Sequence, residues 1–422
     1  MKGLTVLLVL SLVPTLHAAK LHVPADYSTI QSAILSSAQG DTVLVAPGEY
    51  EESVSFLGKS VSLLSSSGAE GTIIRVSLGD SLPVISLPAG SSAGTLIRGF
   101  TLHGGDRVRC ISSTGSSPTV EECVIEHGYV YRDGGGAFFE NGSPTIRNNV
   151  VRFNRTDISG GGIFVRLGVG YGTVRVEGNT CYGNQAPNGP AIAMMQGEGG
   201  VIERNVVYGN STILGSGHPG AVFVWADSVA VVNNTIDGNG QGLTILSASH
   251  VDVRNNIITN NPLGGLELQE EVGPNEAVTC DYNDVWNNGG LDYVAASPAA
   301  HDIMMNPEFT APQTGDFALG DQSPCRDAGD PATLVPPGGG AHVDMGAIEW
   351  VLQGNRGDCD ESGEVTTADI IHLVGYVFKG GPAPSPTAAV GDVNCDRVDS
   401  GSDIICLVNY VFRSAAMPPC VW

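Results

Sequence analysis

An acidic stretch near the C-terminal end of the chain carries oxygen donors at spacings that suit a divalent cation. Side chains supply oxygens at its first, third, fifth, ninth and twelfth positions, and a backbone carbonyl supplies one at its seventh, with Gly363 at the sixth for a sharp turn. The donors are Asp358, Asp360, Ser362, Thr366, Asp369 and, through its carbonyl, Glu364. A set made only of oxygens at this spacing is typical of calcium, which the sequence therefore predicts as a cofactor.

A second stretch repeats the pattern with one departure. Arg397 stands at the position of the turn glycine, so this loop matches the calcium pattern less closely than the first. Both stretches lead into the phrase Asp-Ile-Ile-x-Leu-Val-x-Tyr-Val-Phe, which predicts an amphipathic helix whose apolar stripe packs the two halves together. The donors of the second loop would be Asp392, Asn394, Asp396 and Asp403.

Because the two copies agree in loop and helix, Gly357–Trp422 resembles a type I dockerin module, with Asp rather than Glu at the twelfth loop position. The resemblance implies a small all-α domain that binds calcium and docks onto a cohesin-like module of another protein. Thr367-Ala368 and Gly401-Ser402 fall at positions that such modules use for partner recognition. The alternative is a pair of solvated acidic turns before amphipathic helices.

Earlier in the chain, several strand-like phrases combine apolar alternation with large aromatic residues. Alternate residues of a strand face opposite sides, so placing Ile163, Val165, Val222 and Val224 inward turns the aromatic residues outward. Sugar faces stack on exposed aromatic rings, so these residues are predicted to contact carbohydrate unless a loop covers them. They are Phe138, Phe164, Phe223 and Trp225.

Charged residues beside these aromatic positions are candidates for catalysis. A polysaccharide lyase needs a base and a cationic group at the uronate carboxylate, and a hydrolase needs two carboxylates around the bond that is cleaved. Lys59 is the only lysine between residues 21 and 350, which argues against a lysine base. The candidates are Asp133, Glu140, Asp157 and Arg166, and the alternative is that they form solvated ion pairs at the rim.

A repeated phrase indicates the elements that would position all of these residues. Asn-x-apolar-x-x-Asn begins at Asn149, Asn179, Asn205, Asn234, Asn256 and Asn283. A period of this length predicts a solenoid, and short β-type runs broken by Gly and Asn indicate a parallel β-helix in which stacked Asn side chains bond from coil to coil. Cys181 occupies the apolar position of one copy, which predicts a buried free thiol.

The start of the solenoid has its own signature. Ile30, Ala33 and Ile34 form the apolar stripe of a short amphipathic helix, and a strand with a Pro-Gly turn follows it. This stretch resembles the N-terminal cap and first coil of pectin-lyase-like right-handed β-helix proteins. That resemblance implies an all-β solenoid related to polysaccharide lyases and O-glycosyl hydrolases.

The chain divides into four predicted parts. Residues 1–19 read as a secretory signal, residues 20–350 as the β-helix with an N-terminal cap and a C-terminal closing segment, 351–356 as a linker, and 357–422 as the dockerin-like domain. The closing segment is expected to cap the solenoid. Two disulfides, Cys110–Cys123 and Cys280–Cys325, are compatible with export.

Composition narrows the function further. A net charge of −24 makes nucleic acid an improbable partner, and no apolar run after the signal is long enough for a membrane span. The sequence predicts a protein that is secreted or held at the cell surface, that binds or degrades polysaccharide, and that docks through a calcium-loaded module. The alternative is a noncatalytic adhesive or structural solenoid.

Overall fold

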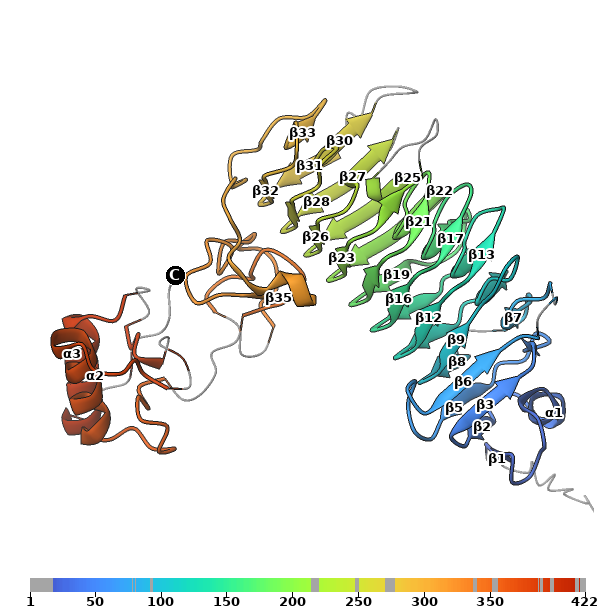
Figure 1. Cartoon of the computed structure of the whole chain (residues 1–422), viewed down its shortest axis with the longest axis horizontal. Helices are drawn as coiled ribbons and strands as arrows, with labels where there is room; N and C mark the ends of the chain where they lie inside the picture. The colour runs from blue at the N-terminus through green and yellow to red at the C-terminus, as the bar shows by residue number, and fades with distance from the viewer. Residues whose placement is uncertain are drawn as a thin grey trace, which may run out of the picture.

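The computed structural model describes residues 18–77, 79, 81–91, 94–213, 220–246, 250–269, 278–336, 340–350, 356–385, 387, 390–394, 398–413 and 417. Residues 20–303 wind into a stack of parallel coils (Figure 1). The predicted parallel β-helix is therefore confirmed. Most of the predicted signal and linker segments lie outside the described residues.

The largest sheet, sheet A, has 19 described strands in two columns, which the long strands β22 (Ile192–Glu203) and β25 (Gly220–Val232) join by running through both. Its pairings are parallel with direct register, so equivalent residues of successive coils stack in rows. The first column also contains β4 (Val54–Ser55), β7 (Ile85–Leu87), β10 (Ile111–Thr114), β14 (Ala137–Glu140), β18 (Ile163–Arg166), β27 (Gln241–Leu246), β30 (Leu266–Gln269) and β33 (Tyr293–Val294). The second contains β1 (Lys20–Val23), β2 (Thr42–Val45), β5 (Ser62–Ser65), β8 (Leu96–Arg98), β11 (Thr119–Glu121), β15 (Thr145–Arg147), β19 (Val174–Glu177), β28 (Val251–Arg254) and β31 (Val278–Asp281).

Sheet B closes the other side of each coil, and a short four-stranded sheet lies in the turns between sheet B and the first column of sheet A. Sheet B is made of β3 (Gly48–Glu51), β6 (Thr72–Arg75), β9 (Thr101–His103), β12 (Val124–Glu126), β16 (Val150–Arg152), β20 (Thr180–Tyr182), β23 (Val206–Tyr208), β26 (Thr235–Asp237), β29 (Ile257–Thr259) and β32 (Asp284–Trp286). The four-stranded sheet is made of β13 (Tyr129–Val130), β17 (Arg155–Thr156), β21 (Gln185–Ala186) and β24 (Ser211–Thr212).

One continuous apolar core fills the solenoid. The inward assignment made from the sequence is confirmed, because Ile163, Val165, Val222 and Val224 all lie in this core. Cys181 is buried as a free thiol between Val151 and Val207 of the adjacent coils, as predicted.

Two ladders of buried Asn side chains flank sheet B, which confirms the role predicted for the repeat. In one ladder, Nδ2 of Asn179 donates to Oδ1 of Asn205 at 3.0 Å and to the carbonyl of Ile146 at 2.9 Å. The backbone N–H of Asn179 donates to the same Oδ1 at 2.9 Å. Each Asn therefore satisfies turn groups of two coils, which would otherwise be buried without partners.

The N-terminal end is covered by helix α1 (Ile30–Ser36), which confirms the predicted cap helix. Thr29 caps it by accepting a hydrogen bond from the Ser32 N–H, and Ile30, Ala33 and Ile34 are buried. This helix covers apolar groups that an open solenoid end would expose to water.

The closing segment, described at residues 306–336 and 340–350, was predicted to cap the solenoid. It folds back along the outer face of sheet B (Figure 1), where Phe317 of β35 (Asp316–Leu319) contacts Tyr208. β35 pairs antiparallel with β34 (Phe309–Ala311), and the 3-10 helix η1 (Pro312–Thr314) joins them. The reason lies in the sheet, since Ile257 faces outward there and needs apolar cover.

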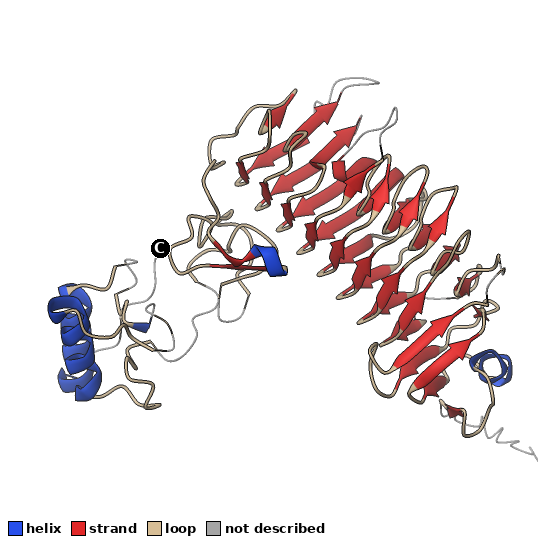
Figure 2. Cartoon of the chain, viewed as in Figure 1, coloured by secondary structure: helices blue, strands red, loops and turns tan. Residues whose placement is uncertain are grey.

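The C-terminal module contains the two predicted helices, α2 (Thr367–Lys379) and α3 (Gly401–Arg413), which contact each other around Leu373 and Leu407. Figure 2 shows these helices apart from the stacked strands. No helix among the described residues is long and apolar enough to cross a membrane.

The two predicted disulfides are absent, because all four cysteines are free thiols in this structure. The Sγ atom of Cys110 donates to the carbonyl of Glu126 at 3.2 Å, whereas that of Cys123 donates to the carbonyl of Glu121 at 3.3 Å. Cys325 contacts the carboxyl of Asp284 instead of Cys280. The predicted pairings therefore do not match the contacts that these sulfurs make.

Candidate functional site

Three of the four predicted catalytic residues meet on the first column of sheet A. Glu140 and Arg166 are register partners on β14 and β18, and Nη1 of Arg166 donates to Oε1 of Glu140 at 2.7 Å. Nη2 of Arg166 lies 3.3 Å from Oδ2 of Asp133, which belongs to the turn before β14. The cluster therefore places one guanidinium between two half-buried carboxylates.

Asp133 has an unusual environment within this cluster. Burial raises the pKa of the Asp133 carboxyl, and the positive charges of Arg166 and Arg109 only partly oppose this effect. Arg109 also donates to the Asp133 carbonyl at 3.1 Å and lies over the Phe138 ring at 4.7 Å. A carboxyl with a raised pKa is suited to hold a proton, which is the state that a general acid requires.

Asp157, the fourth candidate, lies in a different set of contacts. Its Oδ2 accepts a hydrogen bond from the Tyr129 hydroxyl at 2.9 Å, and its Oδ1 lies 3.5 Å from Nη2 of Arg155. The described contacts therefore separate Asp157 from the Arg166 cluster.

The four predicted carbohydrate-binding aromatics face outward but do not form an open strip. Phe164 and Phe223 belong to a second apolar cluster outside the main core, and their exposed fractions are only 0% and 1%. Phe138 is half-buried and stacks on Phe164, with ring centroids 5.4 Å apart, whereas Trp225 is 39% exposed. Of the four, Trp225 alone therefore offers a substantially exposed ring.

Phe164 is buried among Ala193, Phe223 and Leu246, and the turn that precedes its own strand passes close to its Cβ. Gly160 in that turn has φ +70°, and a Cβ built there would lie 2.5 Å from the Cβ of Phe164. Gly134 relates to Phe138 in the same way, at 2.7 Å. Only glycine lets the backbone pass so closely over the ring-bearing residue.

The row next to the buried phenylalanines remains partly accessible. Glu140, Arg166, Met195 and Trp225 stand opposite one another on β14, β18, β22 and β25. The first three are half-buried and Trp225 is exposed. The solenoid therefore carries a line of acidic, basic, thioether and aromatic groups across four consecutive coils.

A second row, on the outer face of sheet B, was not identified from the sequence. Glu126 accepts from Nε of Arg152 at 2.8 Å, and Nη1 of Arg152 donates to the Tyr182 hydroxyl at 3.1 Å. Tyr182 in turn stacks on Tyr208, with ring centroids 5.1 Å apart. The sequence did contain a signal for this row, because its residues directly follow the inward apolar position of each Asn repeat.

In the C-terminal module, three of the predicted calcium ligands lie close together. One carboxylate oxygen from each of Asp358, Asp360 and Asp369 lies within 4.8 Å of the others. Gly363 has φ +89°, and its N–H donates to Oδ2 of Asp358 at 2.8 Å. Three converging carboxylates fit a hard divalent cation, because without one their charges repel.

Helix α2 helps to fix this loop. Thr366 is its N-cap, and the Thr366 N–H donates to Oδ2 of Asp369 at 2.7 Å. Oδ1 of Asp369 accepts from the Asp360 N–H at 3.2 Å. Ser362 contributes a hydroxyl that bonds the Glu364 carbonyl at 3.1 Å, so all six predicted donors belong to one small loop.

The second loop shares part of this geometry. Oδ1 of Asp403 accepts from the Asn394 N–H at 2.9 Å, and Oδ2 accepts from the Ser400 N–H at 2.9 Å. These contacts repeat those of Asp369 in the first loop, with Ser400 at the position of Thr366. Asp392 is buried, and the predicted ligand Asp396 lies outside the described residues.

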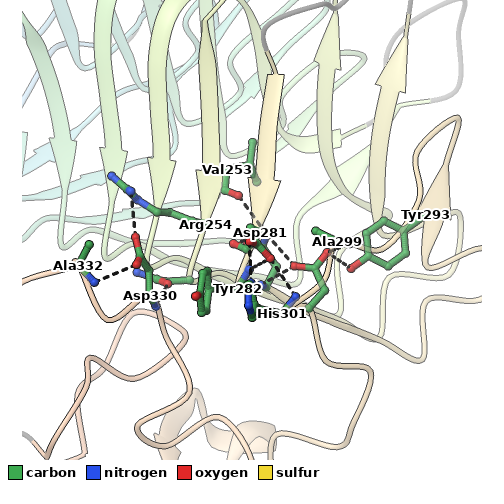
Figure 3. A network of polar contacts seen from close by, with 12 residues as sticks. Val253, Arg254, Asp281, Tyr282, Tyr293, Ala299, His301, Asp330 and Ala332 are labelled. Atoms are coloured by element: carbon green, nitrogen blue, oxygen red, sulfur yellow. Dashed lines mark hydrogen bonds and ion pairs between the residues drawn. The ribbon is translucent and has the colours of Figure 1, made fainter.

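Polar contacts near the last coils fix their turns and, through Asp330, attach the closing segment (Figure 3). Asp281 accepts from the His301 N–H at 3.0 Å, and the His301 ring stacks on Tyr282 with centroids 4.4 Å apart. Nη1 of Arg254 reaches Oδ2 of Asp330 at 3.1 Å. The contacts of His301 hold the last coil together and the Arg254–Asp330 pair attaches the closing segment, so we assign them a structural role.

Comparison with known proteins agrees with this architecture. A family model described as "Right handed beta helix region" matches residues 145–301. The solenoid is a right-handed parallel β-helix. A search of curated proteins gave no match.

Solved structures with similar folds include enzymes that are named for acting on polysaccharides. One is the A-module of a mannuronan C-5 epimerase from Azotobacter vinelandii, with 17% identity, coverage of 66% of this chain and 96% of that chain, and a TM-score of 0.40. Another is a pectate lyase, with 14% identity, coverage of 78% and 96%, and a TM-score of 0.42. A pectin methylesterase from carrot has 16% identity, coverage of 67% and 90%, and a TM-score of 0.32.

Proposed function

We propose that the solenoid binds an extended polysaccharide along the row Glu140–Arg166–Met195–Trp225. The observation that supports this most directly is the composition of the row, with a charged cluster at one end and an exposed indole at the other. Strands of adjacent coils lie about 4.8 Å apart, so the row spans roughly 14 Å. A line of this length suits several units of a linear polymer better than a small molecule.

The aromatic ring and the positive charge of the row each have a role in binding sugars. Trp225 offers an apolar face on which a sugar ring stacks. Arg166 carries the positive charge that a uronate carboxylate requires, and its present partners Glu140 and Asp133 hold it in place. A carboxylate of an acidic polysaccharide would therefore replace part of the ion pairing that Arg166 now makes with Glu140 and Asp133.

The same cluster gives two possible reactions, if the protein is an enzyme. Asp133, with its raised pKa, would be the proton donor. Glu140 would be the second carboxylate of an O-glycosyl hydrolase; in a lyase it would instead take the proton α to the uronate carboxylate, which Arg166 would neutralise. Binding without catalysis is the second candidate function, favoured by the fact that both carboxylates are already paired with Arg166.

One experiment separates these functions. The purified protein is tested against acidic and neutral polysaccharides by affinity electrophoresis, by release of reducing ends and by ultraviolet absorbance of unsaturated products. Trp225→Ala and Arg166→Gln should weaken retention, while Trp286→Ala on sheet B serves as the matched control. Retention without new ends means a binding protein, new ends without absorbance mean hydrolysis, and both together mean elimination.

The outcome that contradicts the proposal is equally defined. If Trp225→Ala and Trp286→Ala retain every polysaccharide equally well, the row is not the binding surface. If no polysaccharide is retained or cleaved, the solenoid is a structural or adhesive protein that recognises something else.

We further propose that the C-terminal module is a dockerin-like domain that binds calcium and then a cohesin-like partner. The three converging carboxylates of the first loop support calcium binding. Docking is supported by exposed apolar residues at matching positions of the two helices, Ile371 and Phe378 on α2 and Ile405 and Phe412 on α3. Thr367, Ala368 and Ser402, which the resemblance links to recognition, are exposed as well.

The docking proposal is tested with a cohesin module as immobilised partner. Binding should require calcium and should fall when Ile371 and Ile405 are replaced together by Ser. If the module binds calcium but no cohesin captures it, the proposed metal site stands and the proposed partner is refuted. The proposed location, secreted or at the cell surface, is tested by fractionation of the producing cells.

A further inference from the structure

We propose that His103, Glu126 and His127 form a binding site for a zinc-like divalent transition-metal ion on the outer face of sheet B. His103 and Glu126 are register partners on β9 and β12, and His127 directly follows β12. One donor atom from each residue lies within 4.8 Å of the others. The site is separate from the polysaccharide row of sheet A and from the acidic calcium loops.

The donor set has the chemistry of zinc rather than calcium. Two imidazole nitrogens and one carboxylate oxygen suit zinc, which accepts such ligands at about 2.0–2.2 Å. Ligands at that distance in tetrahedral geometry lie about 3.3 Å apart. Nδ1 of His103 and Oε1 of Glu126 are already 3.0 Å apart, so an ion needs little rearrangement of this pair.

Glu126 is held in place by its second oxygen. Oε2 of Glu126 accepts from Nε of Arg152 at 2.8 Å, which leaves Oε1 directed at His103. Burial raises the pKa of Glu126, but the hydrogen bonds from His103 and Arg152 outweigh it and lower the pKa, so the carboxylate is ionised. An ionised, oriented oxygen is what a metal ligand requires.

The backbone brings the third ligand to the other two. His127 has φ +58°, in the left-handed region, at a turn where Asn260 and Asn287 stand in later coils. This conformation turns the chain so that the His127 ring lies 4.9 Å from the His103 ring, centroid to centroid, with Phe153 behind it at 5.6 Å. The two imidazoles thus approach each other across adjacent coils.

The site opens to solvent. The side chains of His103 and Glu126 are 41% and 11% exposed, and His127 is exposed. Three protein ligands with access from solvent leave a coordination position for water or for an oxygen of a bound molecule. Arg152 pairs with Glu126, and Arg75, the register partner of His103, pairs with Glu49 and Glu51.

Zinc binding to the full chain is measured by calorimetry, with calcium in excess so that the acidic loops are occupied. We expect one zinc ion at this site and release of protons as the imidazoles exchange them for metal. His127→Asn keeps the turn, because Asn adopts this conformation readily, and should weaken binding at least about tenfold. His103→Gln should do the same, whereas the exposed His22→Gln is the matched control.

A second pair of measurements distinguishes ligation from unspecific attraction. Cobalt in place of zinc should give visible absorption bands that His127→Asn and His103→Gln remove. Arg152→Gln should weaken zinc binding, because it removes the hydrogen bond that orients Glu126, whereas mere charge attraction would become stronger when a positive charge is removed. Unchanged zinc affinity in both His variants, or cobalt bands that both variants retain, would overturn the site.

Discussion

The thiol of Cys325, in the closing segment, donates a hydrogen bond to Oδ2 of Asp284 on β32 at 3.2 Å. Asp284 is fully buried, and its Oδ1 accepts from the Met305 N–H at 3.1 Å. Burial raises the pKa of Asp284 from 3.8 to about 7, because it outweighs these hydrogen bonds. The attachment of the segment therefore depends on a carboxyl that is stable in its neutral form.

This relationship predicts that the closing segment loosens as pH rises. The folded form binds the Asp284 proton more tightly than the unfolded form, so its contribution is complete below the ordinary pKa of 3.8 and is lost as pH passes about 7. Asp344 and Glu349 act in the same direction, because burial raises their pKa values to about 6 and about 7. Limited proteolysis of residues 306–350 should accelerate between about pH 4 and about pH 7.

Asp284→Asn supplies the control for this prediction. The amide cannot ionise, so the variant should lose a large part of the pH dependence while Met305 keeps its acceptor. A loss of protection with rising pH that is as steep in Asp284→Asn as in the parent chain would exclude Asp284 as the source.

The Asn ladder predicts a large and specific loss of stability on truncation. Asn205→Ala removes the oxygen that accepts from the N–H and Nδ2 of Asn179 at 2.9 and 3.0 Å, and the nitrogen that donates to the Val176 carbonyl at 2.8 Å. Unpaired buried groups destabilise by about 1–3 kcal/mol each, so we expect a loss of about 3 kcal/mol in the free energy of unfolding.

Urea denaturation of the full chain measures this effect. Asn306→Ala is the control, because Asn306 is exposed and its side chain accepts only a local bond from the Glu308 N–H at 3.1 Å. If the two variants unfold at the same urea concentration, the ladder contributes little to stability.

Asn ladders and the inward rows could be predicted from the sequence because their cause is local and repeats in every coil. The burial of Phe164 could not, since it depends on packing against Ala193, Phe223 and Leu246 of later coils. His103 and Glu126 escaped notice for a different reason. Each coil contributes one residue to their row, 23 positions apart, and only the register shows that the side chains meet.

The Arg166 cluster lies between these two cases. Sequence position indicated that Asp133, Glu140 and Arg166 border the same strands, and the structure joins them through ion pairs. Asp157 also lies in a turn beside these strands, but it follows β17 and its carboxylate pairs with Tyr129 instead of Arg166. Proximity in the sequence fixes the coil but not the direction of a turn residue.

Cys181 predicts an unreactive thiol in the folded protein. Burial raises the pKa of Cys181 to about 12, so almost no thiolate exists near neutral pH, and the sulfur is fully buried. Modification by a thiol reagent should be negligible until the chain unfolds. Cys181→Val adds a side-chain heavy atom next to Val151 and Val207, so it should destabilise the chain by about 1–3 kcal/mol. Rapid labelling of the native chain at Cys181 would contradict this packing.

The two acidic loops predict a measurable calcium stoichiometry. Asp369 and Asp403 occupy equivalent positions, and each accepts two backbone hydrogen bonds, which an Asn oxygen preserves only in part. Asp369→Asn should abolish calcium binding by the first loop, because it removes one of three converging charges. The thermal unfolding of the helical module should then no longer shift to higher temperature when calcium is added to that loop.

Asp403→Asn decides whether the second loop also binds. If calorimetry finds two calcium ions in the parent chain and one in each variant, both loops are sites, and the substitution Arg397 is tolerated at the turn position. If Asp403→Asn leaves one ion bound while Asp369→Asn leaves none, the second loop holds its shape through the Asn394 and Ser400 hydrogen bonds alone. Two ions that persist in both variants would place calcium elsewhere and refute the assignment of the loops.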